Sequence, residues 1–167
     1  RQAGIIVKGG GHAMAAGLSV DANRLQDLKD FLGERLAAVM AGRPAVPGLA
    51  MDGALKVSGA NLALVETLAK VGPFGSGNAE PRFVITNARI AFADPVGRDQ
   101  SHLRLSLTDE TGNRLSGIAF RAVDTDMGQA LIHHGGAPFH IAGKIRINTW
   151  QGRSTAQILV DDAAAVW

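Results

Sequence analysis

The feature that most constrains the fold is a period-two alternation of apolar and polar residues, which starts near residue 83 and continues almost to the end. Residues 102–108 alternate strictly, with a leucine at every second position. Successive side chains of a strand point to opposite faces, so this period is typical of half-buried β-strands. The later residues that we expect to face a core are Phe139, Ile141, Ile145 and Ile147.

The order of the predicted elements narrows the fold further. We expect strands over 83–93, 102–108 and 114–120, a helix over 125–133, and two more strands joined by a turn at 150–153. Three strands, a helix and two strands are the order of the OB-fold, a five-stranded barrel that often binds oligonucleotides. The same barrel also binds sugars and proteins, so the fold alone does not define a function.

The preceding residues have a helical period. Apolar residues at three- and four-residue spacing predict a helix over 25–39 and a second one, capped by Ser58, that ends before Gly72 and Pro73, with a strand over 51–57 between them. We therefore predict an α+β chain. Its predicted parts are an α/β portion over 1–71 with a proline- and glycine-rich connector at 42–48, a junction at 72–82, and a barrel over 83–167.

A run of glycines with a histidine, GGGHAMAAG over residues 9–17, is the most distinctive string of the first portion. Glycine can adopt positive φ, so consecutive amides can turn toward one anion, and a neighbouring histidine can donate to the same phosphate. We expect a phosphate-binding loop between two short strands. A tight turn whose histidine bonds a nearby carbonyl is the simpler alternative.

Two strings resemble known sequences. GGGHAMAAG is similar to the signature of the DHHA1 substrate-binding domain of DHH-family phosphoesterases. GPFGSGNAEPRF, over residues 72–83, resembles the segment that leads into the OB domain of the RecJ family, with Ala79 where that family has proline. In this junction we expect Phe74 to act as an anchor, and Gly75, Gly77 and Asn78 to shape a loop that a ligand or a neighbouring domain can approach.

The resemblance covers essentially the whole chain and implies the C-terminal part of a metal-dependent exonuclease. Such enzymes hydrolyse single-stranded DNA from the 5′ end in recombination and repair. Their Mn²⁺ or Mg²⁺ ions are held by a DHH domain, and this chain contains no Asp-His-His string. We therefore expect no metal or cofactor on this chain and no nuclease activity from it alone. The residues expected to bind the substrate phosphate beside the metals are Gly9, Gly10, Gly11, His12 and Gly17.

In the barrel, alternation should direct several basic side chains away from the core, where they can contact a phosphate backbone. The expected single-stranded-DNA contacts are Arg104, Arg114, Lys144, Arg146, Trp150 and Arg153. Trp150 can either stack on a base or cover the end of the barrel. Aromatic residues make up 5% of the chain and tyrosine is absent, so we expect charge to contribute more than stacking.

Composition adds limits of its own. A hydrophobic content of 46% is enough for a core, and the absence of cysteine excludes disulfides and fits a reducing compartment. No apolar run reaches the roughly 18 to 20 residues of a membrane span, and the first residues are no signal peptide. We expect a cytoplasmic protein without a membrane partner. The first residue is Arg1 rather than methionine, which fits a piece of a longer protein.

Two alternatives stay open. The first is another DHH-family phosphoesterase, which would act on short oligonucleotides or cyclic dinucleotides; such proteins resemble this chain only over its first segment. The second is a barrel without a catalytic role that docks a DNA-repair partner such as single-stranded-DNA-binding protein. Binding measurements with DNA and with that partner would separate the two roles.

Overall fold

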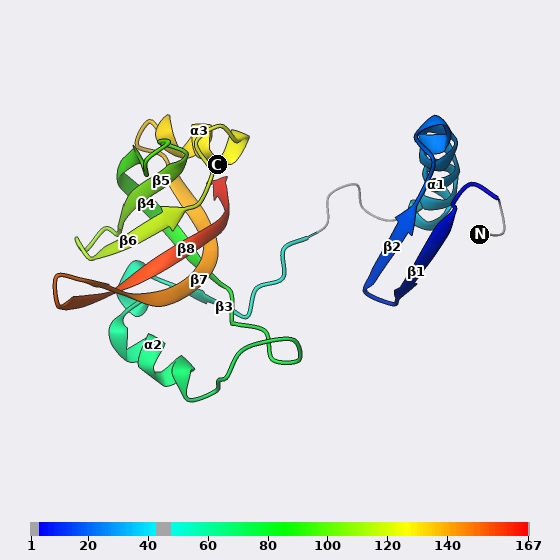
Figure 1. Cartoon of the computed structure of the whole chain (residues 1–167). Coiled ribbons are helices and arrows are strands. Elements are labelled where there is room, and N and C mark those ends of the chain that lie inside the picture. Colours follow the sequence, from blue (N-terminus) through cyan, green and yellow to red (C-terminus); the bar gives the residue numbers. More distant parts are fainter. Residues whose placement is uncertain (1–3, 43–47, 167) are drawn as a thin grey trace. The chain divides into compact units, whose positions relative to one another are not determined.

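The computed structural model describes residues 4–42 and 48–166, and the chain forms two compact units, Arg1–Gly48 and Leu49–Trp167 (Figure 1). We call them the N-terminal unit and the barrel unit. The N-terminal unit contains β1 (Lys8–His12), β2 (Ala15–Ser19), the 3-10 helix η1 (Ala22–Arg24) and α1 (Leu25–Met40). Most of the predicted connector at 42–48 lies outside the described residues.

The glycine run forms part of a β-hairpin rather than a loop. β1 pairs antiparallel with β2, with Gly10 opposite Gly17, and none of the glycines at 9–11 has a positive φ. The predicted phosphate loop is therefore wrong in its conformation, because the two strands use their backbone groups to pair with each other. At Gly11, a Cβ would lie 2.6 Å from the Ala15 carbonyl oxygen, so glycine is needed for this close approach.

The predicted helix over 25–39 is confirmed as α1, but its apolar side chains are not covered. Leu32, Leu36 and Val39 are 43%, 57% and 59% exposed. Among the described residues of the N-terminal unit, none is buried. The helical period predicts the helix correctly, and the surface against which this face would pack does not occur in the described part of the unit.

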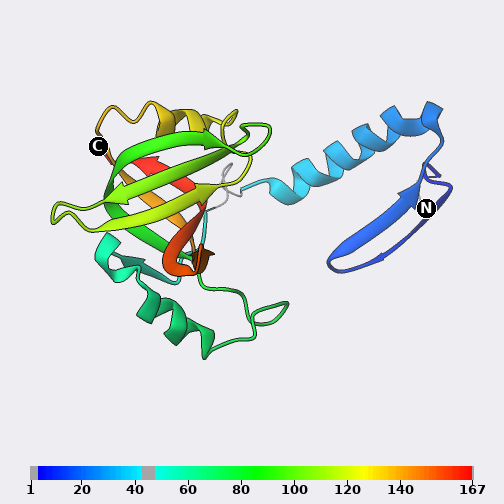
Figure 2. The same cartoon turned by 60° about the vertical axis from the view of Figure 1, so that its left-hand side comes forward.

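The barrel unit contains the predicted OB-fold. Five strands close in the order β4-β5-β6-β8-β7, with β7 pairing back to β4 (Figure 2). α3 lies at one end of the barrel and α2 at the other in both ribbon views. The elements of this unit are β3 (Gly53–Leu55), the 3-10 helix η2 (Val57–Gly59), α2 (Leu62–Ala69), β4 (Phe83–Val96), β5 (His102–Thr108), β6 (Arg114–Ala119), α3 (Asp126–Ile132), β7 (Pro138–Trp150) and β8 (Arg153–Ala165).

The interior of the barrel is filled by the apolar half of each alternating strand. Leu103, Leu105 and Leu107 of β5 are 0% exposed, as are Ile141 of β7 and Ile158 of β8. Each of these positions is in phase with the predicted alternation. Within the described residues, no helix is long and apolar enough to cross a membrane.

The division of the chain differs from the predicted one. β3 pairs in parallel with the start of β4, Val57 and Ala60 belong to the barrel core, and α2 packs against β7 and β8. Residues 49–71 therefore belong to the barrel unit, whereas the sequence pattern assigns them to the portion before the junction at 72–82. The change of period at residue 83 marks a change from helix to strand, which need not coincide with a boundary between units.

Three smaller expectations also differ. The strand predicted over 51–57 is limited to β3, because Val57 already starts η2. Asn61, not Ser58, caps α2: its side-chain oxygen accepts the Leu64 amide at 3.0 Å. Ile147, predicted to face the core, is 46% exposed, because β7 and β8 continue beyond the barrel as a free hairpin.

Candidate nucleic-acid interface

The solvent-facing side of β4, β5 and β6, which we call the outer face, carries part of the predicted interface. Since Leu103 and Leu105 point into the barrel, Arg104 between them points outward. Arg104 lies opposite Asp94 on β4 and opposite Ile118 on β6. The two strand pairings thus bring charged and apolar side chains from three strands onto one surface.

Arg104 is not a free positive charge. Its Nη2 atom donates to Asp94 Oδ2 at 3.1 Å, and its guanidinium lies over the Phe92 ring, 5.4 Å from the centroid. Phe92 itself is 38% exposed. The ion pair offsets the charge, while the stacked guanidinium and ring form a flat surface of the kind on which a base can stack.

A second aromatic side chain lies where β6 ends. Phe120 is 61% exposed and meets the ring of His102 edge-on, with centroids 5.2 Å apart. His102 Nδ1 accepts the backbone amide of Arg121 at 3.0 Å, and Arg121 has a φ of 51°. The histidine therefore fixes the turn that follows Phe120 and holds this exposed ring in place.

Two acidic side chains near the outer face are hydrogen-bonded within turns. Hydrogen bonds from Ser101 hold the pKa of the Asp99 carboxyl below its ordinary value. Hydrogen bonds from Asn113, with further ones from Thr111, do the same to the pKa of Asp109. Both carboxylates stay ionised at neutral pH, so the loops that contain them are less suited to a phosphate than the strands between them.

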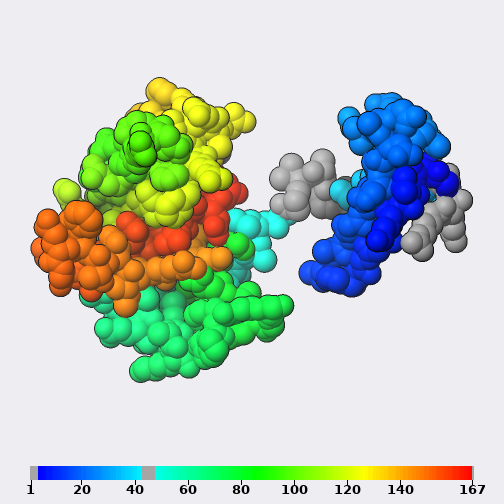
Figure 3. Space-filling model, in the orientation of Figure 1, coloured from blue at the N-terminus to red at the C-terminus, as the bar shows by residue number. Residues whose placement is uncertain are grey.

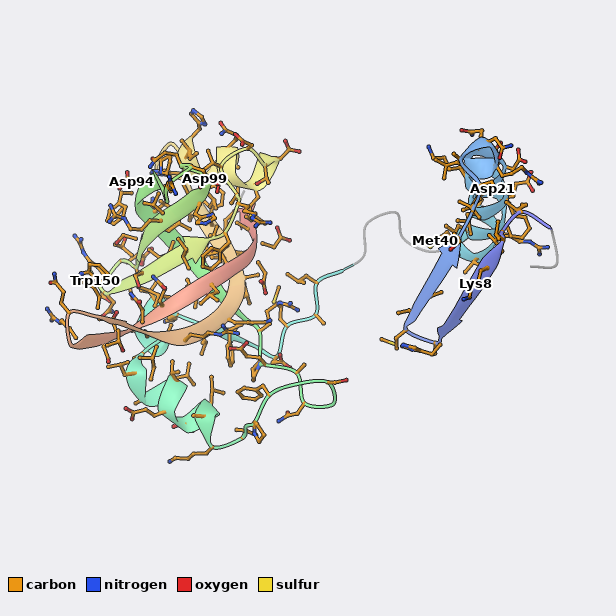
Figure 4. The ribbon with its side chains drawn as sticks, viewed as in Figure 1. Lys8, Asp21, Met40, Asp94, Asp99 and Trp150 are labelled. Atoms are coloured by element: carbon orange, nitrogen blue, oxygen red, sulfur yellow. The ribbon has the colours of Figure 1, made fainter. Side chains whose placement is uncertain are left out.

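The hairpin of β7 and β8 carries Trp150, labelled in Figure 4, at its end. Trp150 pairs with Arg153 across the turn. The turn is tight, with Gln151 and Gly152 at φ values of 49° and 76°. Trp150 is 73% exposed. Of the two roles considered for Trp150, covering the end of the barrel does not agree with this exposure, whereas stacking on a base does.

Lys144 and Arg146 lie elsewhere and share one carboxylate. Arg146 donates to both oxygens of Glu80, through Nε at 2.7 Å and through Nη2, and Lys144 Nζ lies 4.0 Å from Glu80 Oε2. The hydrogen bonds from Arg146 hold the pKa of the Glu80 carboxyl below its ordinary value, against a smaller opposing effect of burial. These contacts fasten the junction to β7, and a role for either residue in DNA binding stays a prediction.

The junction itself is organised by Asn78, whose side-chain amide donates to the carbonyls of Val71 and Pro73 at 3.0 and 3.1 Å. Phe74 is half-buried and lines an apolar groove beside α2. Gly75 and Gly77 form an exposed tip, and a Cβ on either would contact nothing within 4 Å. Asn78 therefore determines the shape of the loop. No steric contact requires glycine at position 75 or 77.

Arg114 and Arg153 differ from the other predicted basic residues. Among the described residues, no carboxylate forms a salt bridge with either of them, whereas Arg104, Lys144 and Arg146 each have one. Both line a single cleft at the start of β6 and β8. Of the basic side chains predicted to bind DNA in the barrel, these two retain an uncompensated charge.

In the N-terminal unit, the predicted phosphate ligands lie on the exposed hairpin. A shallow depression is lined by Lys8, Gly9, Gly10, Gly17 and neighbouring residues, and a Cβ on Gly10 or Gly17 would meet nothing within 4 Å. His12 Nδ1 accepts the Met14 amide at 3.3 Å. The ring proton then belongs to Nε2, which leaves that nitrogen able to donate to a ligand.

Sequence reasoning missed Phe92 and Phe120 as interface residues. Phe120 follows Arg114 by an even number of residues. The alternation that directs the Arg114 side chain outward on β6 therefore also directs the Phe120 side chain outward. Phe92 follows an irregularity in the pairing of β4 with β5 between Ile90 and Phe92, which reverses the phase of the alternation. No local pattern in the sequence marks that bulge.

Comparison with known proteins identifies the family that most of this chain matches. The RecJ OB domain model matches residues 51–162. The single-stranded-DNA-specific exonuclease RecJ of Bacillus subtilis (strain 168) is 25% identical over 155 residues, which are 93% of this chain and 19% of the relative. The RecJ of Haemophilus influenzae is 30% identical over 163 residues, 94% of this chain and 27% of the relative.

A solved structure shares the fold. The crystal structure of RecJ in complex with Mn²⁺ from Thermus thermophilus aligns with a TM-score of 0.59 at 23% identity, over 96% of this chain and 22% of that one. This chain therefore spans between 19% and 27% of the length of these three proteins.

Proposed function

Since this chain belongs to the RecJ OB domain family over residues 51–162, we propose that its barrel unit binds single-stranded DNA within a RecJ-like exonuclease that degrades such DNA from the 5′ end. The observation that carries the binding role is the exposure of Phe92, Phe120 and Trp150, at 38%, 61% and 73%. Exposed aromatic rings on an OB barrel suit the stacking of unpaired bases, each worth about 1–3 kcal/mol.

The proposed interface combines these rings with positive charge. Bases stack on the rings, while basic side chains of the barrel unit contact the phosphates. Stacking tolerates any base, because each base has a π-face, so we expect little sequence preference. Phosphate contacts release counterions, so we expect the affinity to fall steeply as salt is added.

For the N-terminal unit, we propose the role of a partial DHHA1 domain. Gly10 and Gly17 offer an exposed backbone surface beside Lys8 and the half-buried Gly9, and His12 has a nitrogen free to donate to a phosphate. In the longer protein this hairpin would hold the DNA phosphate next to the metal ions of a DHH domain, which supply an activated water for hydrolysis.

The chain by itself is proposed to be inactive. No group of three histidine, aspartate or glutamate side chains that could hold a metal ion occurs in the part of the chain that the structure describes. The residues of this chain therefore have the roles of binding and orienting DNA. Release of nucleotides from single-stranded DNA by the purified chain with Mn²⁺ would contradict this.

The family match favours this proposal over the first alternative, since proteins acting on short oligonucleotides or cyclic dinucleotides are expected to resemble only the first segment. The second alternative, a barrel that docks single-stranded-DNA-binding protein, is compatible with DNA binding and stays a prediction. No contact among the described residues favours it specifically.

The proposal is tested by fluorescence anisotropy with a labelled oligo-dT strand and the whole chain. We expect Phe120→Ala and Trp150→Ala each to weaken binding by about 5- to 100-fold, which corresponds to about 1–3 kcal/mol of lost stacking. Val39→Ala is a control, because Val39 is 59% exposed on α1, which is not part of the proposed interface. An affinity that is independent of salt, or unaffected by both aromatic substitutions, would sink the proposal.

A further inference from the structure

A cleft of about 630 Å³ lies between the start of α2 and the first residues of β6 and β8. Its wall consists of residues 60–63, 114–116 and 153–156, and we call it the α2 cleft. β6 and β8 run parallel, with Ser116 opposite Gln157, so both strands begin at the same end of the barrel. In the space-filling view, the β7–β8 hairpin (orange) stands beside α2 (green) at this end (Figure 3).

The charge of the α2 cleft is positive and uncompensated. Arg114 and Arg153 both line it, and none of the described residues in its wall is acidic. Two guanidinium groups that share a cleft repel each other, and an anion between them would remove that repulsion. A guanidinium offers planar, paired donors that match the oxygens of a phosphate.

Three neutral polar side chains of the wall, those of Asn61, Ser116 and Ser154, already have hydrogen-bond partners. Asn61 accepts the Leu64 amide and donates to the Ser58 carbonyl at 3.1 Å, and the Ser154 hydroxyl pairs with that of Thr149 at 2.9 Å. The side of the cleft formed by α2 is therefore neutral. Recognition of an anion in the cleft would depend on Arg114 and Arg153.

The aromatic ring of Trp150 beside this anion site favours a nucleic-acid strand over a free phosphate ion as the ligand. Its exposed ring lies opposite Arg153 across the hairpin turn, so a base stacked on Trp150 would have its phosphate close to that arginine. At the other wall of the cleft, β6 leads from Arg114 along the outer face to Ile118 and Phe120. A DNA single strand could therefore run from the Trp150 ring through the α2 cleft and along the outer face to the Phe120 ring.

We propose that the α2 cleft is a phosphate-binding subsite for single-stranded DNA, in which Arg114 and Arg153 each contact one backbone phosphate. This inference rests on the proposed function and extends it: the strand leaves the outer face of the barrel and continues along α2, a helix outside the five barrel strands. α2 thereby forms one wall of the DNA path.

The test is the salt dependence of oligo-dT binding by the whole chain and by the double variant Arg114→Gln/Arg153→Gln. Each lost phosphate contact should reduce the slope of log affinity against log salt by about 0.7, so we expect a reduction of about 1.4. At low salt we also expect at least about a tenfold loss of affinity. Arg114→Lys/Arg153→Lys keeps the charge and should restore the slope with only part of the affinity.

The matched control is Arg24→Gln/Arg35→Gln, which removes the same net charge from the N-terminal unit and should leave the slope almost unchanged. An excess of pyrophosphate should displace DNA from the wild type only at millimolar concentrations. If the glutamine double variant binds DNA with the slope of the wild type, the subsite is overturned while the proposed function stands. If the wild type itself does not bind DNA, both fail together.

Discussion

The two units differ in whether their apolar residues find an interior. In the barrel unit, Ile85, Leu105 and Ile158 are 0% exposed, whereas in the N-terminal unit Leu36 is 57% and Met14 is 88% exposed. Both units have the apolar periodicity of their secondary structure. Periodicity therefore indicates which face will be buried, but it does not indicate whether the surface that buries it lies in the same unit.

Ion pairs differ between the units in the same way. In the described part of the N-terminal unit, Arg24 pairs with Asp27, three residues along the chain. In the barrel unit, Arg82 pairs with Asp161 and Arg146 pairs with Glu80, which are 79 and 66 residues apart. Contacts of this range tie strands together, so the barrel should unfold as one cooperative unit. A hairpin and a helix without buried residues should not.

The strongest test of this contrast is to separate the units. We expect a fragment of residues 49–167 to retain the free energy of unfolding of the whole barrel within about 0.5 kcal/mol, because all buried core residues in the described part of the chain lie within this fragment. A fragment of residues 1–48 should be largely unfolded. Urea unfolding followed by tryptophan fluorescence measures the first, and far-ultraviolet circular dichroism measures the second.

The two fragments serve as controls for each other. A cooperative thermal transition in the fragment of residues 1–48 would show that its exposed leucines are covered without another part of the protein. A molten or aggregated fragment of residues 49–167 would show that the N-terminal unit contributes to the barrel. Either result would remove the contrast between the units.

A glycine in each unit gives a second, smaller test. At Gly143, where β7 is irregular against β8, a Cβ would lie 2.0 Å from the Leu159 carbonyl oxygen. Gly143→Ala should therefore cost about 3 kcal/mol, the upper end of the range for overpacking. Gly10→Ala should cost the barrel nothing, because its Cβ would contact nothing within 4 Å. Urea midpoints of the two variants of the whole chain would measure the difference, and equal midpoints would contradict it.

The barrel was largely predictable from the sequence because its signals are local and repeated. β5 runs over His102–Thr108 as predicted, since a strand with one buried face must place an apolar residue at every second position. Thr125 caps α3 by accepting the Gly128 amide, as expected of a threonine at the start of a helix. Once the order of the elements was known, the closed topology followed from a small set of known folds.

The remaining features depend on contacts between distant residues. The sequence predicts a loop or a tight turn at the glycines of residues 9–11, and the extended conformation results from pairing with β2, which no local pattern indicates. Likewise, the partners of Arg104 and Arg146 come from residues 10 and 66 positions away, so sequence alone could not separate compensated arginines from Arg114 and Arg153. For the candidate site, the residue types were predictable and their charge balance was not.

Glu80 provides the smallest test, because its pairing with Arg146 is a long-range contact of the barrel unit at a partly exposed position. The hydrogen bonds from Arg146 lower the pKa of Glu80 in the folded chain, so its contribution to stability is present above the ordinary carboxyl pKa of about 4.3 and is lost as the pH falls through the lowered value. Glu80→Gln should thus reduce the free energy of unfolding by at most about 1 kcal/mol at pH 7 and by nearly nothing at pH 2. Asp27→Asn, which breaks the local pair with Arg24, should leave the unfolding of the barrel unchanged at both pH values. A loss for Glu80→Gln that is as large at pH 2 as at pH 7 would mean that the side chain acts through packing rather than through its charge.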